Sequence, residues 1–443
     1  MPRELFGTDG IRGVAGQYPL DAATVTAVGD ALGRRIVARG EGLGVIIGMD
    51  TRESGPALAS HIAAGLVRHG VNVDFAGVTT TPGVAYLAKN GPFAAGVMIS
   101  ASHNPYRDNG IKILGHSGYK LPDDQEESLE RDILAYDGVT ASKELAVDEN
   151  LDRDYIDHLA ATLSRDLSSL HMVVDCANGS ASHLAPVLFG KLGARVKAIG
   201  AAPNGRNINL NCGSLHLESL REMVLGEGAG LGVAFDGDAD RALFVSASGR
   251  VVDGDAVLLI AARHLKSQGK LPGDVVVATV MSNLGLERAL QAHGIRLIRM
   301  PVGDKYVLEE MLRIGAALGG EQSGHIIFHE WATTGDGMLT ALRLFEVMTT
   351  TGASLDDLAS EMKVHPQKLV NVRIRERKPI EELAAVQSEI RAAESAFGSS
   401  GRVLVRFSGT EPLARVMVEG EDVSLVEEYS ARIASEIRAS LGE

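Results

Sequence analysis

The segment from Asp236 to Arg241 follows the apolar run 231–235 and carries three carboxylates at alternate positions: Asp236, Asp238 and Asp240. In an extended turn, alternate residues can converge on one cation, and Mg²⁺ prefers carboxylate oxygens in octahedral geometry. An EF-hand calcium loop is excluded, because its sixth and twelfth positions need Gly and Glu, whereas Arg241 and Ala247 stand there. An ordinary acidic turn is the remaining alternative. The position after a buried strand favours a metal site, since open α/β sheets bind ligands beyond the carboxyl ends of strands.

A second informative segment, 100–105, has the sequence SASHNP and follows a predicted strand that ends at Ile99. Ser102 beside His103 and near Lys112 suits a nucleophile or a phosphoryl acceptor, because serine needs a base or a cation to react. For a phosphoryl acceptor, positioning and electrostatics supply most of the catalysis. The alternative is that the Asn-Pro and Asn-Gly pairs of this stretch only form turns. The stretch alone leaves these two interpretations evenly balanced.

A third segment, Gly320–His325, follows an apolar strand and places polar side chains between glycines: Glu321, Gln322, Ser323 and His325. These groups could bind the hydroxyls and an amine of a sugar. A β-turn with solvated polar groups is the alternative, and this segment alone favours that alternative.

A fourth segment, Arg406–Pro412, has the sequence RFSGTEP, and Arg415 follows it. Its backbone amide at Gly409, the hydroxyls of Ser408 and Thr410 and a guanidinium would make a phosphate cradle. A plain hairpin loop is the alternative.

These loops need a scaffold, and the hydrophobic periodicity predicts strands that alternate with helices. Three rounds of this alternation predict three related α/β domains with mixed, mostly parallel sheets, at 1–150, 151–253 and 254–366. After the pair His365-Pro366 the pattern changes to a strand, a helix, two strands and a last helix. The change predicts a smaller α+β domain at 367–443.

The 443 residues carry a formal net charge of −14, with 45% hydrophobic and 23% charged residues. This composition fits a globular protein, and the negative charge argues against nucleic-acid and anionic-membrane partners. The two cysteines lack metal or redox spacing. The absence of a signal peptide and of a long apolar run predicts a cytoplasmic protein. Without a Walker A sequence or a GxGxxG after a strand, nucleotide-driven kinases and dinucleotide enzymes are disfavoured.

The four motifs, in this order and one per predicted domain, resemble those of the α-D-phosphohexomutase superfamily, and within it the amino-sugar branch. The resemblance begins at Phe6–Gly13, with the sequence FGTDGIRG, and covers essentially the whole chain. Gln322 and Asp304 match the amino-sugar pattern, where hexose relatives often carry Met and His. An acidic group near a sugar ammonium would be favourable. Phe407 departs from the pattern, because members usually carry the stiffer Pro there.

The resemblance implies a phosphoryl group on Ser102, with Mg²⁺ held by that group and by Asp236, Asp238 and Asp240. It assigns the transfer region to Arg12, Lys112 and Arg241, and it leaves His103 and His325 as competing candidates for proton transfer. Sugar binding falls to Glu321, Gln322, Ser323 and Asp304. Binding of the second phosphate falls to Arg406, Ser408, Gly409, Thr410 and Arg415.

The implied reaction interconverts glucosamine 6-phosphate and glucosamine 1-phosphate through a sugar 1,6-bisphosphate, which also serves as primer. Its product would supply UDP-N-acetylglucosamine and peptidoglycan synthesis. The alternatives are a phosphoglucomutase or phosphomannomutase with the same residues, a noncatalytic sugar-phosphate sensor and a metal-dependent phosphatase. The expected partner is a small amino-sugar phosphate. The sequence does not fix the oligomeric state, and a homodimer is compatible with it.

Overall fold

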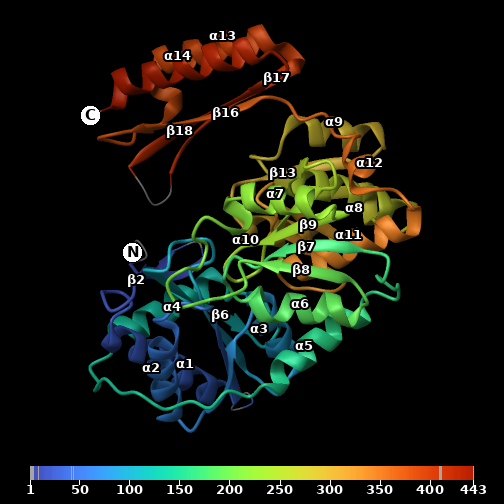
Figure 1. The fold of residues 1–443 in the computed structure, drawn as a ribbon. Coiled ribbons are helices and arrows are strands. Elements are labelled where there is room, and N and C mark those ends of the chain that lie inside the picture. Colours follow the sequence, from blue (N-terminus) through green and yellow to red (C-terminus); the bar gives the residue numbers. More distant parts are fainter. Residues whose placement is uncertain (1–3, 8, 41, 43, 409–411, 443) are drawn as a thin grey trace. The chain divides into compact units, whose positions relative to one another are not determined.

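Residues 4–7, 9–40, 42, 44–408 and 412–442 are described by the computed structural model shown in Figure 1. The chain forms two compact units. The larger contains the residues up to 281 together with 295–360, and the smaller contains 282–294 together with the residues from 361 onward. Each unit has a hydrophobic core of its own.

The larger unit begins with a mixed sheet in the order β1-β2-β6-β5-β3-β4. Its strands are β1 (Phe6–Gly7), β2 (Gly10–Val14), β3 (Gly44–Met49), β4 (Asn72–Val78), β5 (Ala95–Ile99) and β6 (Asp108–Gly115). Strands β5, β3 and β4 are parallel, whereas β1, β2 and β6 pair antiparallel with their neighbours. Val45 and Ile47 enter one core and Ile46 enters the opposite one, as the two-residue period of a strand requires.

The helices of this first part are α1 (Ala22–Arg39), α2 (Gly55–Val67), α3 (Thr81–Asn90), α4 (Asp123–Leu134) and α5 (Asn150–Ala161). Buried residues of α1, α2 and α4 share one core with the sheet, and α3 packs on the other face. Helix α1 was not predicted from the sequence. Asp21 caps it by accepting the N–H groups of Ala23 and Thr24, and Gly40 ends it in the left-handed conformation.

Two further mixed sheets follow in the larger unit, in the orders β11-β10-β9-β7-β8 and β13-β12-β14-β15. The strands are β7 (His171–Asp175), β8 (Arg195–Ile199), β9 (Leu231–Phe235), β10 (Ala242–Ser246), β11 (Val251–Val252), β12 (Val275–Thr279), β13 (Arg296–Met300), β14 (Leu318–Gly320) and β15 (Ile326–Phe328). Antiparallel strands form one edge of each sheet, β10 and β11 in the first and β15 in the second. The helices are α6 (Ala181–Lys191), α7 (Glu218–Glu227), α8 (Gly254–Ser267), α10 (Asp304–Ile314), α11 (Gly337–Thr351) and α12 (Leu355–Ala359).

Each of the three sheets of the larger unit has one predicted loop. The loop lies between a strand of the parallel part of the sheet and the antiparallel strand that follows. The serine loop (100–107) connects β5 to β6, the aspartate loop (236–241) connects β9 to β10, and the sugar loop (321–325) connects β14 to β15. All three loops therefore leave the carboxyl end of a parallel strand, where open α/β sheets bind their ligands. The three domains repeat this arrangement without a close sequence repeat.

The smaller unit contains an antiparallel sheet in the order β16-β18-β17, covered by α13 and α14. Its elements are α9 (Leu284–Ala292), β16 (Gln367–Arg373), α13 (Ala384–Phe397), β17 (Gly401–Phe407), β18 (Leu413–Gly420) and α14 (Val423–Leu441). The segment before α9 is tied to the residues that precede β16. The side chain of Asn283 donates to the carbonyl of His365 and accepts its N–H, each at 2.9 Å.

The predicted fold class is confirmed, with three α/β domains built on mixed sheets and a small C-terminal domain. The sheets contain more antiparallel pairing than the periodicity indicated. In each of them, the strand that follows the predicted loop pairs antiparallel with the strand that precedes it. The domain limits near 150, 253 and 366 stay predictions. Among the described residues, no helix is long and apolar enough to cross a membrane.

Candidate active site

The serine loop and the aspartate loop meet at Ser102. Its Oγ donates a hydrogen bond to Oδ2 of Asp236 at 2.5 Å and lies 3.3 Å from Nδ1 of His103. Ser102 is 3% exposed, and its φ of 50° lies in the left-handed region that non-glycine residues rarely adopt. Backbone strain of this kind concentrates at functional sites. The fold therefore holds this hydroxyl against the aspartate loop.

The aspartates of the loop form a buried acidic cluster. One ligand atom from each of Asp236, Asp238 and Asp240 lies within 4.8 Å of the other two. Among the described residues, Oδ1 of Asp238 and Oδ1 of Asp240 are buried without a hydrogen-bond partner. Burial raises the pKa of Asp236 well above its ordinary value, and the negative charges of Asp240 and Asp238 add to the effect. Buried carboxylate oxygens with unused lone pairs are ligands that a hard divalent cation prefers, so this cluster fits Mg²⁺.

Lys112, on β6, places a cation inside this acidic cluster. Its Nζ lies 2.9 Å from Asp238, 3.2 Å from Asp9 and 3.6 Å from Asp240. Burial opposes its charge, but the three carboxylates outweigh burial and raise the pKa of Lys112 well above its ordinary value. Burial would raise the pKa of Asp238, but Lys112 and the hydroxyl of Thr81 together lower it below its ordinary value. Both side chains are therefore charged at neutral pH.

A second, half-buried lysine continues this network towards the third domain. Nζ of Lys120 lies 2.5 Å from Asp9 and 2.6 Å from Asp304, the first residue of α10. Asp304 also lies 3.7 Å from Nε2 of His325. Burial would raise the pKa of Asp304, but Lys120 and His325 lower it. Charges of alternating sign thus lead from the aspartate loop to α10 through Lys112, Asp9, Lys120 and Asp304.

Two arginines also belong to this network. Arg12, on β2, forms an ion pair with Asp9, and the backbone N–H of Arg241 donates to Asp236 at 3.2 Å. Burial and the positive charges of Arg241 and Arg12 lower the pKa of His103 to about 4. His103 is therefore neutral at pH 7 and can accept a proton.

The sugar loop is joined to the aspartate loop by a β-bridge between Arg241 and His325. Nε2 of His325 accepts the N–H of Gly335 at 3.3 Å and lies 4.0 Å from Asp240. Within the described part of the chain, Oγ of Ser323 is buried and has no hydrogen-bond partner. Ser323 therefore offers an unused hydroxyl to a ligand, as a sugar-binding residue must.

The two residues predicted to select an amino sugar already have protein partners. Nε2 of Gln322 donates to Asp253 at 3.1 Å, and Asp304 is paired with Lys120. Glu321 also has a protein partner, because it accepts the backbone N–H of Gly303 at 3.2 Å. A sugar amine near Asp304 would therefore share that carboxylate with Lys120.

The smaller unit brings three arginines to the fourth predicted loop. Arg406 on β17 and Arg415 on β18 stand directly opposite each other in the sheet. Arg377 donates to the carbonyl of Ser408 at 2.6 Å, and Arg415 lies 3.5 Å from the hydroxyl of Ser408. Burial and the charge of Arg415 lower the pKa of Arg406. Guanidinium groups bind phosphate oxygens through paired hydrogen bonds, so a cluster of three arginines fits a phosphate. The predicted residues Gly409 and Thr410 lie outside the described residues.

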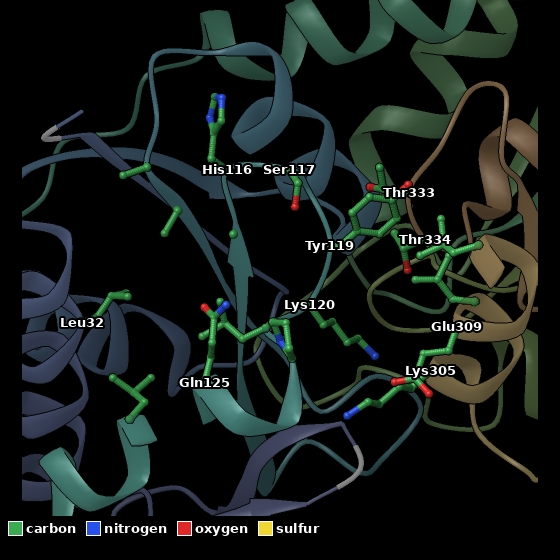
Figure 2. Close-up of a pocket in the computed structure, with 18 of the residues that line it drawn as sticks. Leu32, His116, Ser117, Tyr119, Lys120, Gln125, Lys305, Glu309, Thr333 and Thr334 are labelled. Atoms are coloured by element: carbon green, nitrogen blue, oxygen red, sulfur yellow. The ribbon is translucent and has the colours of Figure 1, made fainter. Parts of the chain in front are cut away.

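A cavity of about 590 Å³ lies beside the Lys120–Asp304 pair in the larger unit (Figure 2). Its wall combines aliphatic and polar side chains, with Leu32 at one end and Lys305 at the other (Figure 2). Lys305 is paired with Asp123. Ser102, Asp236, Asp238 and Asp240 do not line this cavity. This cavity is therefore not assigned to the substrate.

Several residues of the site were not predicted from the sequence: Asp9, Thr81, Lys120 and Arg377. Thr81 donates its hydroxyl to Asp238 at 2.6 Å. Asp9 lies in the opening motif Phe6–Gly13, so that motif could have indicated it. The other three are single polar residues with no distinctive spacing, and only the folded chain brings them to the loops.

Models of the phosphoglucomutase/phosphomannomutase family match nearly the whole chain. Their alpha/beta/alpha domains I, II and III match residues 3–139, 153–249 and 253–365, and their C-terminal domain matches 369–436. Among solved structures, a phosphoglucomutase/phosphomannomutase family protein from Burkholderia thailandensis is similar, with a TM-score of 0.81 and 26% identity over 97% of this chain and 96% of that one. N-acetylphosphoglucosamine mutase of Aspergillus fumigatus, solved with GlcNAc-6P and magnesium, shares the fold with a TM-score of 0.70 at 18% identity, over 99% of this chain and 96% of that one.

Curated relatives are more similar in sequence. Phosphoglucosamine mutase of Solibacter usitatus is 59% identical over 100% of both chains. Phosphoglucosamine mutase of Koribacter versatilis is 51% identical over 99% of this chain and 98% of that one. Identity at this level, over full lengths and across four domains, leaves no other family to consider. The chain belongs to the phosphoglucosamine mutase family of the phosphohexomutase superfamily, and it is an enzyme of the isomerase class.

Proposed function

We propose that this enzyme interconverts glucosamine 6-phosphate and glucosamine 1-phosphate, with Ser102 as the phosphoryl carrier. The observation that carries the proposal is the position of the Ser102 hydroxyl, 2.5 Å from Asp236 in a buried cluster of carboxylates. A serine in such a place is suited to carry a phosphoryl group that the neighbouring cations stabilise. In the cell, a cytoplasmic enzyme of this kind would supply amino-sugar 1-phosphate for UDP-N-acetylglucosamine and peptidoglycan.

The proposed reaction consists of two phosphoryl transfers. In the first, the 1-hydroxyl of glucosamine 6-phosphate attacks the phosphorus on Ser102. The O1–P bond forms, the bond from phosphorus to Oγ breaks, and the hydroxyl proton passes to a base. The resulting sugar 1,6-bisphosphate turns around, and Oγ of Ser102 then attacks the phosphorus on O6. The bond from O6 to phosphorus breaks and O6 takes up a proton, which leaves glucosamine 1-phosphate. His103 and His325 are the candidates for the proton transfers.

The chain's own residues prepare this site in three ways. Asp236, Asp238 and Asp240 would hold Mg²⁺ together with the phosphate on Ser102, and the bound ion would supply positive charge to the transferring phosphoryl group. Lys112 is fixed as a cation by the carboxylates around it. Low exposure of this cluster limits the access of water, which would otherwise hydrolyse the phosphoserine.

The choice of an amino sugar rests on the curated relatives and on two residues of the third domain. Relatives named phosphoglucosamine mutase are 46–59% identical to this chain. Asp304 carries a negative charge that a sugar ammonium would share with Lys120, and Gln322 lies in the same domain. In the smaller unit, the anion-binding residues proposed for the second phosphate are Arg377, Arg406 and Arg415.

The test is a coupled assay with glucosamine, glucose and mannose 6-phosphates, each with Mg²⁺ and glucose 1,6-bisphosphate as primer. We expect turnover to be highest with glucosamine 6-phosphate, and to be lost when EDTA removes the metal. Preference for a neutral hexose phosphate would retain the mechanism and overturn the substrate. Stoichiometric release of inorganic phosphate would indicate a phosphatase, and no reaction with any sugar would indicate a sensor.

A further inference from the structure

The backbone of Ser102 is held on both sides by side chains that do not take part in the proposed transfer. Its N–H donates to Oγ of Ser100 at 2.9 Å. Its carbonyl accepts from Nη2 of Arg52 at 3.1 Å and from Nδ2 of Asn209 at 2.9 Å. Both peptide groups of this left-handed residue are therefore fixed by side chains rather than by a strand.

The same two donors also hold the carbonyl of Asn104, two residues further along the serine loop. Arg52 donates to it at 2.6 Å and Asn209 at 3.1 Å. Arg52 follows β3 in the first domain, whereas Asn209 follows β8 in the second. Strand β3 is the parallel neighbour of β5, so the carboxyl ends of the two strands bring Arg52 to the serine loop. The loop is thus gripped from two domains at once.

Asp50 fixes the position of Arg52, the donor from the first domain. It forms an ion pair with Arg52 and accepts the N–H of Arg52 at 3.0 Å. It also hydrogen-bonds with Ser100. The side chains of Asp50 and Arg52 are both 0% exposed, so neither can touch the substrate. Their burial is explained by what they hold, which is the backbone of the serine loop.

The aspartate loop packs directly on the gripped carbonyl. A Cβ atom on Gly237 would lie 2.4 Å from the carbonyl oxygen of Ser102 and 3.0 Å from Nδ2 of Asn209. No side chain fits there, so the backbones of the two loops are in close contact. A shift of the Ser102 carbonyl would therefore move the Ser102 hydroxyl relative to Asp236.

We propose that Arg52, Ser100 and Asn209 are positioning residues that hold the backbone of Ser102 and thereby aim its phosphoryl group along the line of transfer. This inference rests on the proposed function. Loss of one of these residues should lower the rate of transfer, because phosphoryl transfer needs the attacking and leaving oxygens in line. A misplacement of about 1 Å can cost about a hundredfold in rate. These residues touch no substrate, so they should influence kcat and leave KM unchanged.

The variant that tests the proposal is Asn209→Gly. Asn209 has a φ of 58°, which glycine adopts without strain, so this change removes the amide and keeps the backbone. Asn211 is a matched control, because it is exposed and has a φ of 52°. We expect Asn209→Gly to lower kcat about tenfold to a hundredfold with KM within about twofold of wild type. Asn211→Gly should leave both constants unchanged. A raised KM with unchanged kcat would overturn the proposal, since Asn209 would then bind substrate.

A second measurement needs no mutase activity. Hydrogen exchange of the amides in residues 101–106 should be faster in Asn209→Gly by about fivefold or more, and should be unchanged in Asn211→Gly. Equal exchange rates of these amides in Asn209→Gly and wild type would overturn the proposal that Asn209 holds the serine loop. If wild type itself turned over no sugar phosphate, the proposed function would fail, while this exchange comparison would still decide whether Asn209 holds the loop.

Discussion

Replacing Lys112 by Met gives the sharpest test of how the buried charges of the site balance. Met preserves much of the length and volume of the side chain but removes the ammonium. The 2% exposed side chain of Lys112 contacts three carboxylates, from Asp9, Asp238 and Asp240. The substitution therefore leaves a buried acidic cluster with much less compensation.

The magnitude follows from the distances. At an effective dielectric constant of about 20, a pair of opposite charges at 3 to 4 Å interacts by roughly 4 to 6 kcal/mol, and the cost of burying the ammonium offsets much of that. Removing one partner of a buried pair typically costs about 3 to 5 kcal/mol. We expect the free energy of unfolding to fall by about that amount, which is a large part of the total stability of an ordinary domain.

The loss should grow with pH. In wild type, Lys112 lowers the pKa of Asp238, so this carboxylate stabilises the fold above its unfolded pKa and loses that effect in acid. In the variant, burial without the ammonium raises the folded pKa of Asp238, so stability falls as pH rises. Urea unfolding at pH 5 and pH 8 measures the fall in the variant, because the wild-type loss occurs at a more acid pH. The control is Lys191→Met, because Lys191 forms an exposed ion pair with Asp157 and its loss should cost less than about 1 kcal/mol.

Mg²⁺ should change the stability of Lys112→Met in the opposite direction. Without the ammonium, the aspartate cluster should attract a divalent cation more strongly, so Mg²⁺ should raise the unfolding midpoint of Lys112→Met more than that of wild type. The reasoning is refuted if Lys112→Met and Lys191→Met have equal stability. It is also refuted if Mg²⁺ stabilises Lys112→Met no more than it stabilises wild type.

Three further outcomes are expected. Ser102→Ala should accept no phosphoryl group from glucose 1,6-bisphosphate, as intact-protein mass spectrometry would show, and a phosphorylated variant would move the acceptor to another residue. Arg406→Leu should relieve the repulsion from Arg415 and stabilise the C-terminal unit by up to about 1 kcal/mol, while KM for the sugar phosphate rises about tenfold or more; a KM that stays the same would exclude Arg406 from phosphate binding. Burial raises the pKa of Asp336 to about 6, so this group should cost wild type about 3 kcal/mol of stability between pH 4 and pH 7. Asp336→Asn should remove that loss in urea titrations, and an unchanged pH dependence in the variant would contradict this reasoning.

The four loops could be found from the sequence because their chemistry is local. Three carboxylates at alternate positions, or a serine between a strand end and an Asn-Pro pair, are visible without knowledge of the fold. Helix α1 was also within reach, since Asp21 and Gly40 are the residues that begin and end helices, and Val25, Val28, Leu32 and Ile36 are its buried stripe.

The contacts between domains could not be found in this way. Asn209 reaches the carbonyl of Ser102 across 107 residues, and Lys120 reaches Asp304 across 184. No periodicity or motif connects such positions, because the pairs are made by the meeting of sheet edges. The sequence therefore indicated four candidate loops for the chemistry, and it did not predict the contacts that hold these loops together.

Asp304 illustrates what this difference means for substrate selection. As an isolated acidic residue in the sequence it indicated a partner for a sugar ammonium, but in the fold it already binds Lys120 at 2.6 Å. Asp304 and Asp9 both raise the pKa of Lys120, against the effect of burial, so the ammonium of Lys120 persists when substrate arrives. A sugar amine then meets a carboxylate whose charge is partly neutralised. Selectivity from this contact must be smaller than a lone carboxylate would give, and Lys120→Met should increase the preference for glucosamine over glucose 6-phosphate if Asp304 provides it.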